Sequence, residues 1–375
     1  MPNSSRTTFK RLAGTLTLWL ALTATARADD DDGWTHDAAL ETWLYAGVYR
    51  LTQPLPLPRW QDNAEGRLDL SARHDGLRLM LAPRFTGQRA CPPAGADCQN
   101  TDRLRLNQGF ASWASGSDQW VVGRELLSWG PAQFRSPSNP FYFDSGRTDP
   151  LADTPGIDLA RWTVSDGGWR WSSVYVGDTR TVAAPRQRDT WLFKADRQTD
   201  DGLYSLIASQ ASAQHQGPFW GGFAQWSLND AWLFYGEASL QRGGADDVGR
   251  WLTGASYTAE GGHILSAEYL FNGAGLSTTG DISPLLQAAP PSLLNRHYLW
   301  ASVQSNPQAL ARYWRLEWRR NLDDRSTGWV LYGEKRLQAR LSGFAMLTLG
   351  EGGAGSEFGG LYRSGVTLGL KLYLL

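Results

Sequence analysis

Hydrophobic and polar residues alternate along most of this chain, most regularly in its last ten residues, Val366–Leu375. Side chains in a β-strand point alternately to opposite faces, so this period of two predicts a strand. One face carries only aliphatic residues: Val366, Leu368, Leu370, Leu372 and Leu374. The other carries Thr367, Gly369, Lys371 and Tyr373. Terminal residues are usually loosely held, so we expect another strand to hold this one by pairing.

Residues 66–86 show the clearest hairpin. The Asp75-Gly76 signal fits a two-residue turn, and such a turn fixes the register of the two flanking strands. The register places these pairs opposite one another: Arg73 with Arg78, and Arg67 with Arg84. Turn chemistry and hydrophobic pattern therefore agree that all four arginines share one face and the leucines the other.

Short turn signals alternate with longer connections along the rest of the chain. The short signals fall at residues 74–76, 115–118, 165–167, 200–202, 229–230 and 260–262. The longer connections fall near residues 52–63, 88–102, 130–156, 178–188, 243–248, 273–294 and 350–362. The segments between them predict an all-β chain of about 16–18 strands, an even number.

The C-terminal strand resembles that of bacterial outer-membrane β-barrels, in which a glycine and two further residues precede alternating hydrophobics. Here the matching positions are Gly369, Leu372 and Leu374, and Leu375 stands where the family usually has phenylalanine. The resemblance implies a transmembrane antiparallel barrel with short periplasmic turns and long extracellular loops. It also implies the outer membrane of a Gram-negative bacterium, contact with its lipid, and recognition of the last strand by the barrel-assembly machinery.

The N-terminal segment predicts export. Arg6, Lys10 and Arg11 precede a short apolar run, residues 12–22, and Ala26-Arg27-Ala28 fits a cleavage site. We therefore expect a signal peptide at 1–28, an acidic periplasmic leader at 29–38, and the barrel at 39–375. The alternative is a retained anchor helix, although the apolar run is short for a bilayer span.

Composition also fits a barrel. Mean hydropathy is −0.39, yet 42% of residues are hydrophobic, and the chain holds 19 Trp, 13 Tyr and 13 Phe. Alternation conceals the apolar positions, because each lipid-facing residue has a lumen-facing neighbour. Tryptophan and tyrosine suit the membrane interface. The net charge of −1 gives no indication of nucleic-acid binding. A soluble secreted β-protein is the alternative.

A group of arginines lies on the predicted lumen side between residues 67 and 105. This basic wall comprises Arg67, Arg73, Arg78, Arg84, Arg103 and Arg105. A barrel of this size encloses water, and charge of one sign along its wall attracts ions of the other sign. The wall predicts a pore that favours anions. Alternatively, the arginines pair with acidic loops folded into the barrel and form an ordinary charged lumen.

The proline-rich loop after Trp129-Gly130, residues 130–156, is the other distinctive segment. Loops of this length in compact domains are usually functional or disordered, and its clustered aromatics argue against disorder. We expect it to fold inward or across the mouth and narrow the channel; the alternative is a surface loop packed on its neighbours. Candidate constriction residues are Arg135, Phe141, Tyr142, Asp144, Arg147, Asp149 and Asp153.

Trp129-Gly130-Pro131, followed by Ser138-Asn139-Pro140, is also similar to segments of capsule-assembly and alginate-export barrels. This weaker resemblance covers a small part of the chain. It implies export or surface anchoring of an exopolysaccharide, with an acidic polymer favoured by an arginine-rich lumen.

Cys91 and Cys98 are the only cysteines, and in an oxidising compartment we expect them to form a local disulfide. The chain has neither a Gly-x-Ser-x-Gly elbow nor an HExxH motif, and we predict no enzyme activity, no cofactor and no metal site. The sequence thus favours an outer-membrane channel through which small anionic solutes diffuse. Polysaccharide export or anchoring is the alternative.

Overall fold

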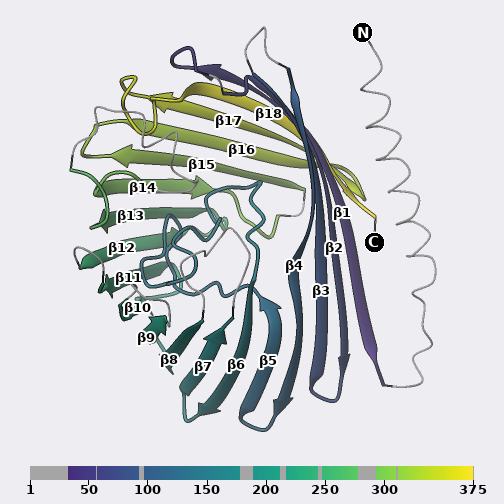
Figure 1. The fold of residues 1–375 in the computed structure, drawn as a ribbon, viewed down its shortest axis with the longest axis vertical. Helices are drawn as coiled ribbons and strands as arrows, with labels where there is room; N and C mark the ends of the chain where they lie inside the picture. Colours follow the sequence, from purple (N-terminus) through teal and green to yellow (C-terminus); the bar gives the residue numbers. More distant parts are fainter. Residues whose placement is uncertain are drawn as a thin grey trace.

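The computed structural model describes residues 33–55, 57–92, 97–177, 189–211, 217–243, 247–277, 293–309 and 311–374, so the predicted signal peptide lies outside the described residues. The strands form one antiparallel sheet closed into a barrel (Figure 1). The strands are β1 (Thr35–Leu51), β2 (Trp60–His74), β3 (Leu77–Cys91), β4 (Gln99–Ser115), β5 (Asp118–Glu125), β6 (Ile157–Asp166), β7 (Trp169–Val176), β8 (Thr190–Gln198), β9 (Gly202–Ala211), β10 (Phe219–Ser227), β11 (Trp232–Gln241), β12 (Val248–Thr258), β13 (Ile264–Asn272), β14 (His297–Gln304), β15 (Arg312–Asn321), β16 (Thr327–Gln338), β17 (Leu341–Glu351) and β18 (Tyr362–Tyr373). The described residues form eighteen strands, which confirms the predicted all-β barrel and matches the upper end of the predicted range.

The barrel closes where β18 pairs with β1, as the terminal strand predicted. Leu44 lies opposite Leu370, and Val48 lies opposite Val366. On β18, Leu368 is 59% exposed on the outer face, whereas Thr367 is 1% exposed. Strand β1 begins at Thr35, somewhat before the boundary drawn at residue 39.

No helix among the described residues is long and apolar enough to cross a bilayer.

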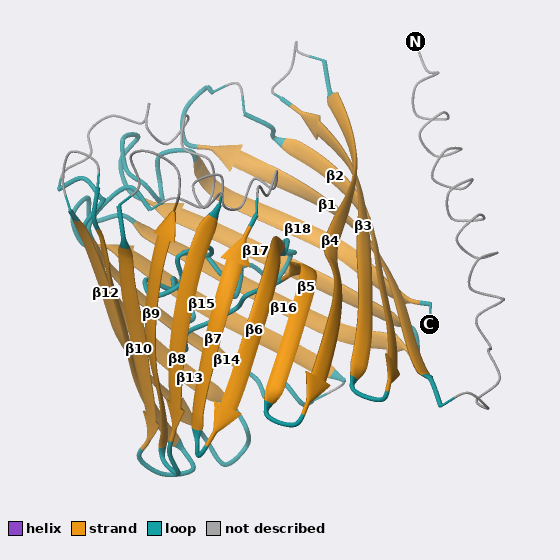
Figure 2. Cartoon of the chain, turned by 60° about the horizontal axis from the view of Figure 1, so that its bottom comes forward, coloured by secondary structure: helices purple, strands orange, loops and turns teal. Residues whose placement is uncertain are grey.

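Tight turns gather at one end of the barrel and most of the longer connections at the other (Figure 2). We call these the short-turn end and the long-loop end. The turn between β2 and β3 has Asp75 and Gly76 at φ 44° and 83°. Positive φ at both central residues is typical of the hairpin turn predicted there. The paired residues match the prediction as well, because Arg67 lies opposite Arg84 and Arg73 opposite Arg78.

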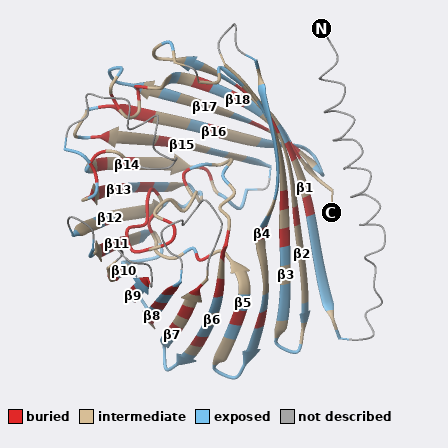
Figure 3. Ribbon diagram, viewed as in Figure 1, coloured by how far each residue is buried: buried red, intermediate tan, exposed pale blue. Residues whose placement is uncertain are grey.

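Many large hydrophobic side chains on the strands are exposed, as expected where strands face lipid. Buried and exposed residues are interspersed along the strands (Figure 3). Exposed tryptophans border the short turns on several neighbouring strands, among them Trp113, Trp120, Trp162, Trp169, Trp226 and Trp232. Others stand near the opposite ends of their strands: Trp60, Trp191, Trp220 and Trp251. Aromatic girdles at both membrane interfaces are characteristic of outer-membrane barrels.

If the outer face of β18 contacts lipid, a charged side chain placed there should lower the stability of the barrel, and by more near the middle of the membrane than near its edges. Leu368→Lys, near the middle of the strand, is expected to lower stability by about 2–4 kcal/mol and to reduce the folded fraction in outer membranes. Leu337→Lys, on an exposed leucine close to the short-turn end, is expected to cost about 0–1 kcal/mol. Urea titrations in lipid vesicles measure both values. Equal costs at the two positions would contradict the assignment.

Candidate functional site

Residues 126–156, between β5 and β6, lie inside the ring of strands, and we call them the inner loop (Figure 1). Strand β5 ends at Glu125, whereas we expected it to continue to Trp129. The Leu127 side chain lies in the interior, where it is 3% exposed. The Leu127 carbonyl then accepts a hydrogen bond from the Asn139 side chain (2.9 Å).

Apolar contacts hold the first half of the inner loop against the wall formed by β5–β10. Leu127, Phe141 and Tyr142 belong to a buried cluster that also contains these wall residues: Val121, Ile157, Leu159, Val174, Val176, Leu192, Ile207, Phe219 and Phe223. Phe141 and Tyr142, two of the candidate constriction residues, are each 3% exposed. They therefore pack the loop against the wall and do not border an open passage.

Two carboxylates on the opposite wall bind the backbone of the inner loop. Glu237 of β11 accepts hydrogen bonds from Ala132 N (2.9 Å), Ser136 Oγ (2.7 Å), Ser138 N (3.2 Å) and Ser138 Oγ (2.7 Å). Glu268 of β13 accepts from Gln133 N (2.6 Å), Phe134 N (2.8 Å) and Tyr235 Oη (2.7 Å). Both carboxylates lie on inward faces, as alternation predicts, but nothing in the local pattern marked them as anchors of the loop.

Charged candidates within the inner loop bind other parts of the same loop. Arg135 is buried and forms an ion pair with Asp144 (2.9 Å). Burial lowers the pKa of the Arg135 guanidinium, and the Asp144 carboxylate opposes that shift. Arg147 donates to the carbonyls of Gly130 (3.0 Å) and Ala132 (2.6 Å). These bonds fix the shape of the loop.

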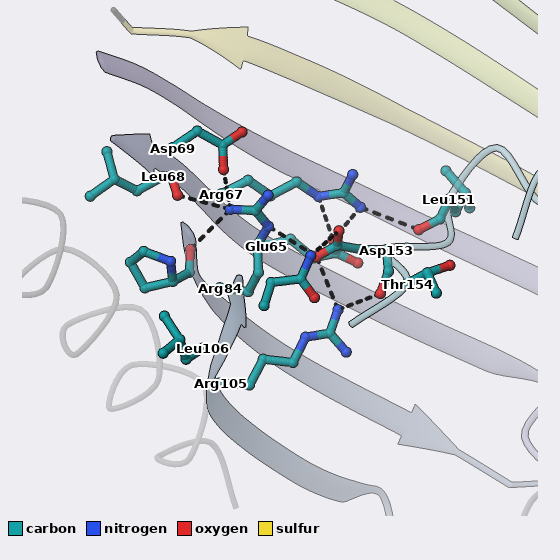
Figure 4. A network of polar contacts seen from close by, with 12 residues as sticks. Glu65, Arg67, Leu68, Asp69, Arg84, Arg105, Leu106, Leu151, Asp153 and Thr154 are labelled. Carbon is teal, nitrogen blue, oxygen red and sulfur yellow. Dashed lines mark hydrogen bonds and ion pairs between the residues drawn. The ribbon is translucent and has the colours of Figure 1, made fainter. Parts of the chain in front are cut away.

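Asp153 connects the inner loop to the basic wall (Figure 4). Its carboxylate accepts from Arg84 Nε, Arg105 NH2 and Asn107 Nδ2, each at 3.0 Å. Arg84, which is 8% exposed, also contacts Asp69 (2.7 Å). The pairing of Arg84 and Arg105 with a loop carboxylate matches the ordinary charged lumen that we considered as the alternative.

Arg67 is also paired. Its guanidinium contacts Glu65 (2.7 Å), donates to the Leu151 carbonyl (3.2 Å) and lies over the Trp43 ring at 3.6 Å. The three central arginines of the wall, Arg67, Arg84 and Arg105, therefore sit beside acidic partners. Their net charge is largely neutralised.

The other three wall arginines differ from these. Arg73 and Arg78 lie near the short-turn end, Arg103 lies toward the long-loop end, and all three are exposed. Within the part of the chain that the structure describes, none forms an ion pair with a carboxylate, although Arg78 lies over the Phe110 ring at 5.7 Å. The six arginines thus follow the inner face of β2–β4 from one end to the other, and the ones near the ends keep an unneutralised charge.

Strand β15 holds the inner loop from a third side. Arg315 donates to the Arg147 carbonyl (2.7 Å), and Arg319 donates to the Thr148 carbonyl (3.0 Å). Glu317, between them on the same strand, is fully buried and contacts both guanidiniums. Asp149, the remaining candidate, accepts a hydrogen bond from Leu151 N (2.9 Å) and so shapes the turn of the loop.

Two cavities adjoin the inner loop. One, of about 320 Å³, lies between the loop and β11–β15 on the short-turn side. The other, of about 250 Å³, lies against β2–β4 and is lined by Thr86, Gln88, Thr101, Arg103, Arg105 and Asp153, among others. The inner loop therefore separates two polar cavities, and each of them has arginine in its lining.

Cys91 and Cys98 form the predicted disulfide, at the connection between β3 and β4. Among the described residues, no group of His, Cys, Asp and Glu side chains is arranged to hold a metal ion.

The eighteen strands of the described residues form a closed barrel with many apolar side chains outside and a mixed interior, which is the architecture of outer-membrane β-barrels. No protein-family model matches the chain, and no curated protein matches it. Solved structures of outer-membrane porins share its fold. OccK5 (OpdH) of Pseudomonas aeruginosa is 11% identical at a TM-score of 0.57, covering 91% of this chain and 98% of its own. OccK11 (OpdR) of the same organism is 11% identical at 0.58, covering 91% and 96%. OprD of the same organism is 10% identical at 0.55, covering 90% and 95%.

Proposed function

We propose that this barrel is a diffusion channel for small solutes and that it favours anions. The observation that carries the proposal is the set of exposed lumen arginines without an acidic partner among the described residues, Arg73, Arg78 and Arg103. The likeness to outer-membrane porins supports the channel itself.

The preference for anions follows from which charges remain after pairing. An ion pair at contact distance is nearly neutral from a few ångströms away, so the Arg84–Asp153 and Arg67–Glu65 pairs add little to the long-range potential. Arg73, Arg78 and Arg103 are not compensated in this way. Within a narrow aqueous passage, low-dielectric walls concentrate their field and raise the local concentration of anions.

Planar-bilayer recordings under a KCl gradient test this proposal. We expect the reversal potential to show preferential chloride passage, and to lose much of that preference at high salt, where the Debye length falls to about 3 Å. A preference for potassium would contradict the proposal.

Passage or anchoring of an acidic polysaccharide is the second candidate, because the arginines continue from one end of the barrel to the other and match a repeating anion. The same recordings distinguish the two. Long acidic oligosaccharides that block the current for far longer than their monomers do would favour the polymer.

A further inference from the structure

We propose that the outer surface of β15 and β16, at the short-turn end of the barrel, binds the headgroup of an anionic phospholipid. Two residues carry the inference: Arg312, the first residue of β15, and Lys335, near the end of β16. This surface lies outside the lumen, so the inference does not depend on the ion preference proposed for the channel.

The two cations share the outer face of the sheet. Arg312 lies directly opposite Lys335 in the antiparallel register, and both are exposed. Alternation places them on the same face as Trp314 and Leu331, which are 38% and 43% exposed. Glu317, on the opposite face of β15, is fully buried inside the barrel. Arg312 and Lys335 therefore face the surroundings of the barrel and not the channel.

The position along the strands is that of a membrane interface. On the outer face, Trp314 lies next to the pair toward the middle of the barrel wall, and the exposed Leu337 lies next to it toward the turn. Exposed tryptophan is enriched at the level of lipid headgroups. Long basic side chains at this level lay their apolar stems along the protein and extend the charge to the headgroups. Lipid phosphates are thus within reach of both cations.

The charges of the pair are not compensated by the protein. Like charges directly opposite one another, with Cβ atoms about 4.5–5.5 Å apart, destabilise an antiparallel sheet. Neither side chain forms an ion pair or a hydrogen bond within the described residues. Glu334, the carboxylate next to Lys335 in the chain, faces the lumen and pairs with Lys371 (2.6 Å). An anion held between the two cations would relieve their repulsion, and on this face of the barrel lipid supplies it.

The charge of this sector also differs from that of the other short turns. Acidic residues lie in or beside the turns of β2–β3, β6–β7, β8–β9, β10–β11 and β12–β13: Asp75, Asp166, Asp200, Asp201, Asp230 and Glu260. The turn between β16 and β17 instead holds Arg340, which is exposed. Anionic headgroups around the short-turn end would therefore collect beside β15–β17 and be repelled elsewhere.

The chemistry of the pair selects the class of lipid. Short turns of outer-membrane barrels face the periplasm, where the leaflet consists of phospholipid. A guanidinium and an ammonium group both donate charge-assisted hydrogen bonds to phosphate oxygens. A zwitterionic headgroup brings its own cation close to Arg312 and Lys335, whereas the glycerol of phosphatidylglycerol is neutral. The pair therefore favours a lipid with net negative charge.

Native mass spectrometry of the whole barrel, released from micelles with equal amounts of phosphatidylglycerol and phosphatidylcholine, tests the inference. We expect the unmodified barrel to retain phosphatidylglycerol over phosphatidylcholine by about tenfold, as expected for two basic residues at a membrane surface. Arg312→Gln combined with Lys335→Gln is expected to abolish this preference.

Arg197→Gln is the matched control. Arg197 is a basic residue on the outer face of β8 at the same end of the barrel, but it lies over the Trp169 ring at 5.3 Å and donates to the Gly167 carbonyl. The phosphatidylglycerol preference should survive this substitution. Equal retention of the two lipids by the unmodified barrel, or a preference that survives the double substitution, would overturn the inference.

Thermal unfolding in vesicles separates lipid binding from a structural role of the pair. In pure phosphatidylcholine the double variant is expected to be at least as stable as the unmodified barrel, because the repulsion between the two cations is gone. With one third phosphatidylglycerol, only the unmodified barrel should gain stability. A double variant destabilised equally in both lipids would show a structural role and overturn the inference. Displacement of phosphatidylglycerol by inorganic phosphate, but not by chloride at equal ionic strength, would assign the site to a free anion and also overturn it.

Discussion

Replacing Glu237 and Glu268 together with alanine is expected to raise the single-channel conductance severalfold while the barrel stays folded. The two carboxylates accept most of the hydrogen bonds that the segment from Ala132 to Ser138 makes with the barrel wall. Each buried donor left without an acceptor costs about 1–3 kcal/mol. Without these hydrogen bonds the docked position of the inner loop would no longer be the most stable one. The loop would then move out of part of the channel and leave a wider opening for ions.

Single-channel recording measures the effect, and electrophoretic mobility before and after heating shows that the barrel is intact. Glu334→Ala is the matched control, because Glu334 pairs with Lys371 on the wall and makes no hydrogen bond to the inner loop among the described residues. An unchanged conductance in the double variant, with an intact barrel, would show that the apolar cluster, Asp153 and strand β15 hold the loop without these two carboxylates.

Asp153→Asn is expected to increase the preference for anions and to reduce thermal stability. The substitution leaves the guanidiniums of Arg84 and Arg105 without the loop carboxylate that both contact. One unit of charge in a watery passage changes ion energies by about 1 kcal/mol at 4 Å, so the chloride-to-potassium permeability ratio should rise about two- to fivefold. Stability falls because Arg84 is buried and keeps only one carboxylate partner, Asp69, beside its hydrogen bonds to the carbonyls of Leu68 and Pro83.

Asp158→Asn is the control for this substitution. Asp158 pairs with Arg124 (2.6 Å) on the outward faces of β5 and β6, so the same chemical change there should not alter ion selectivity. If both variants shift the reversal potential by the same amount, the shift comes from the change in the net charge of the protein and not from the position of Asp153 in the lumen. A shift toward potassium in Asp153→Asn would contradict the pairing with the basic wall.

Local patterns in the sequence were sufficient to predict an all-β chain of about 16–18 strands and the register of the hairpin at residues 66–86. Alternation is a property of neighbouring residues, and Asp75-Gly76 restricts its own turn, so both signals can be read without knowledge of the rest of the chain. The outward leucines of β18 and the inward Lys371 follow from the same rule.

The contacts of the inner loop could not be predicted from such local patterns. Its anchors join residues far apart in the chain, such as Ala132 with Glu237 and Phe134 with Glu268, and the residues beside them carry no sign of these contacts. The aromatic pair Phe141 and Tyr142 correctly indicated an ordered loop, but sequence alone did not show whether they face water or pack against a wall. The basic wall divides for the same reason: pairing of Arg84 depends on Asp153, whereas Arg103 has the same strand pattern and no such partner among the described residues.

The most direct test of the central claim is the reversal potential of a variant that changes only the unpaired arginines: Arg73→Gln, Arg78→Gln and Arg103→Gln together. These residues are exposed, and none forms an ion pair within the described residues, so the barrel should keep its stability. We predict that chloride preference under a KCl gradient falls to near zero in this variant and survives Leu337→Gln, an uncharged change on the outer surface. Unchanged chloride preference in the triple variant would show that other charges set the selectivity, and it would contradict the claim.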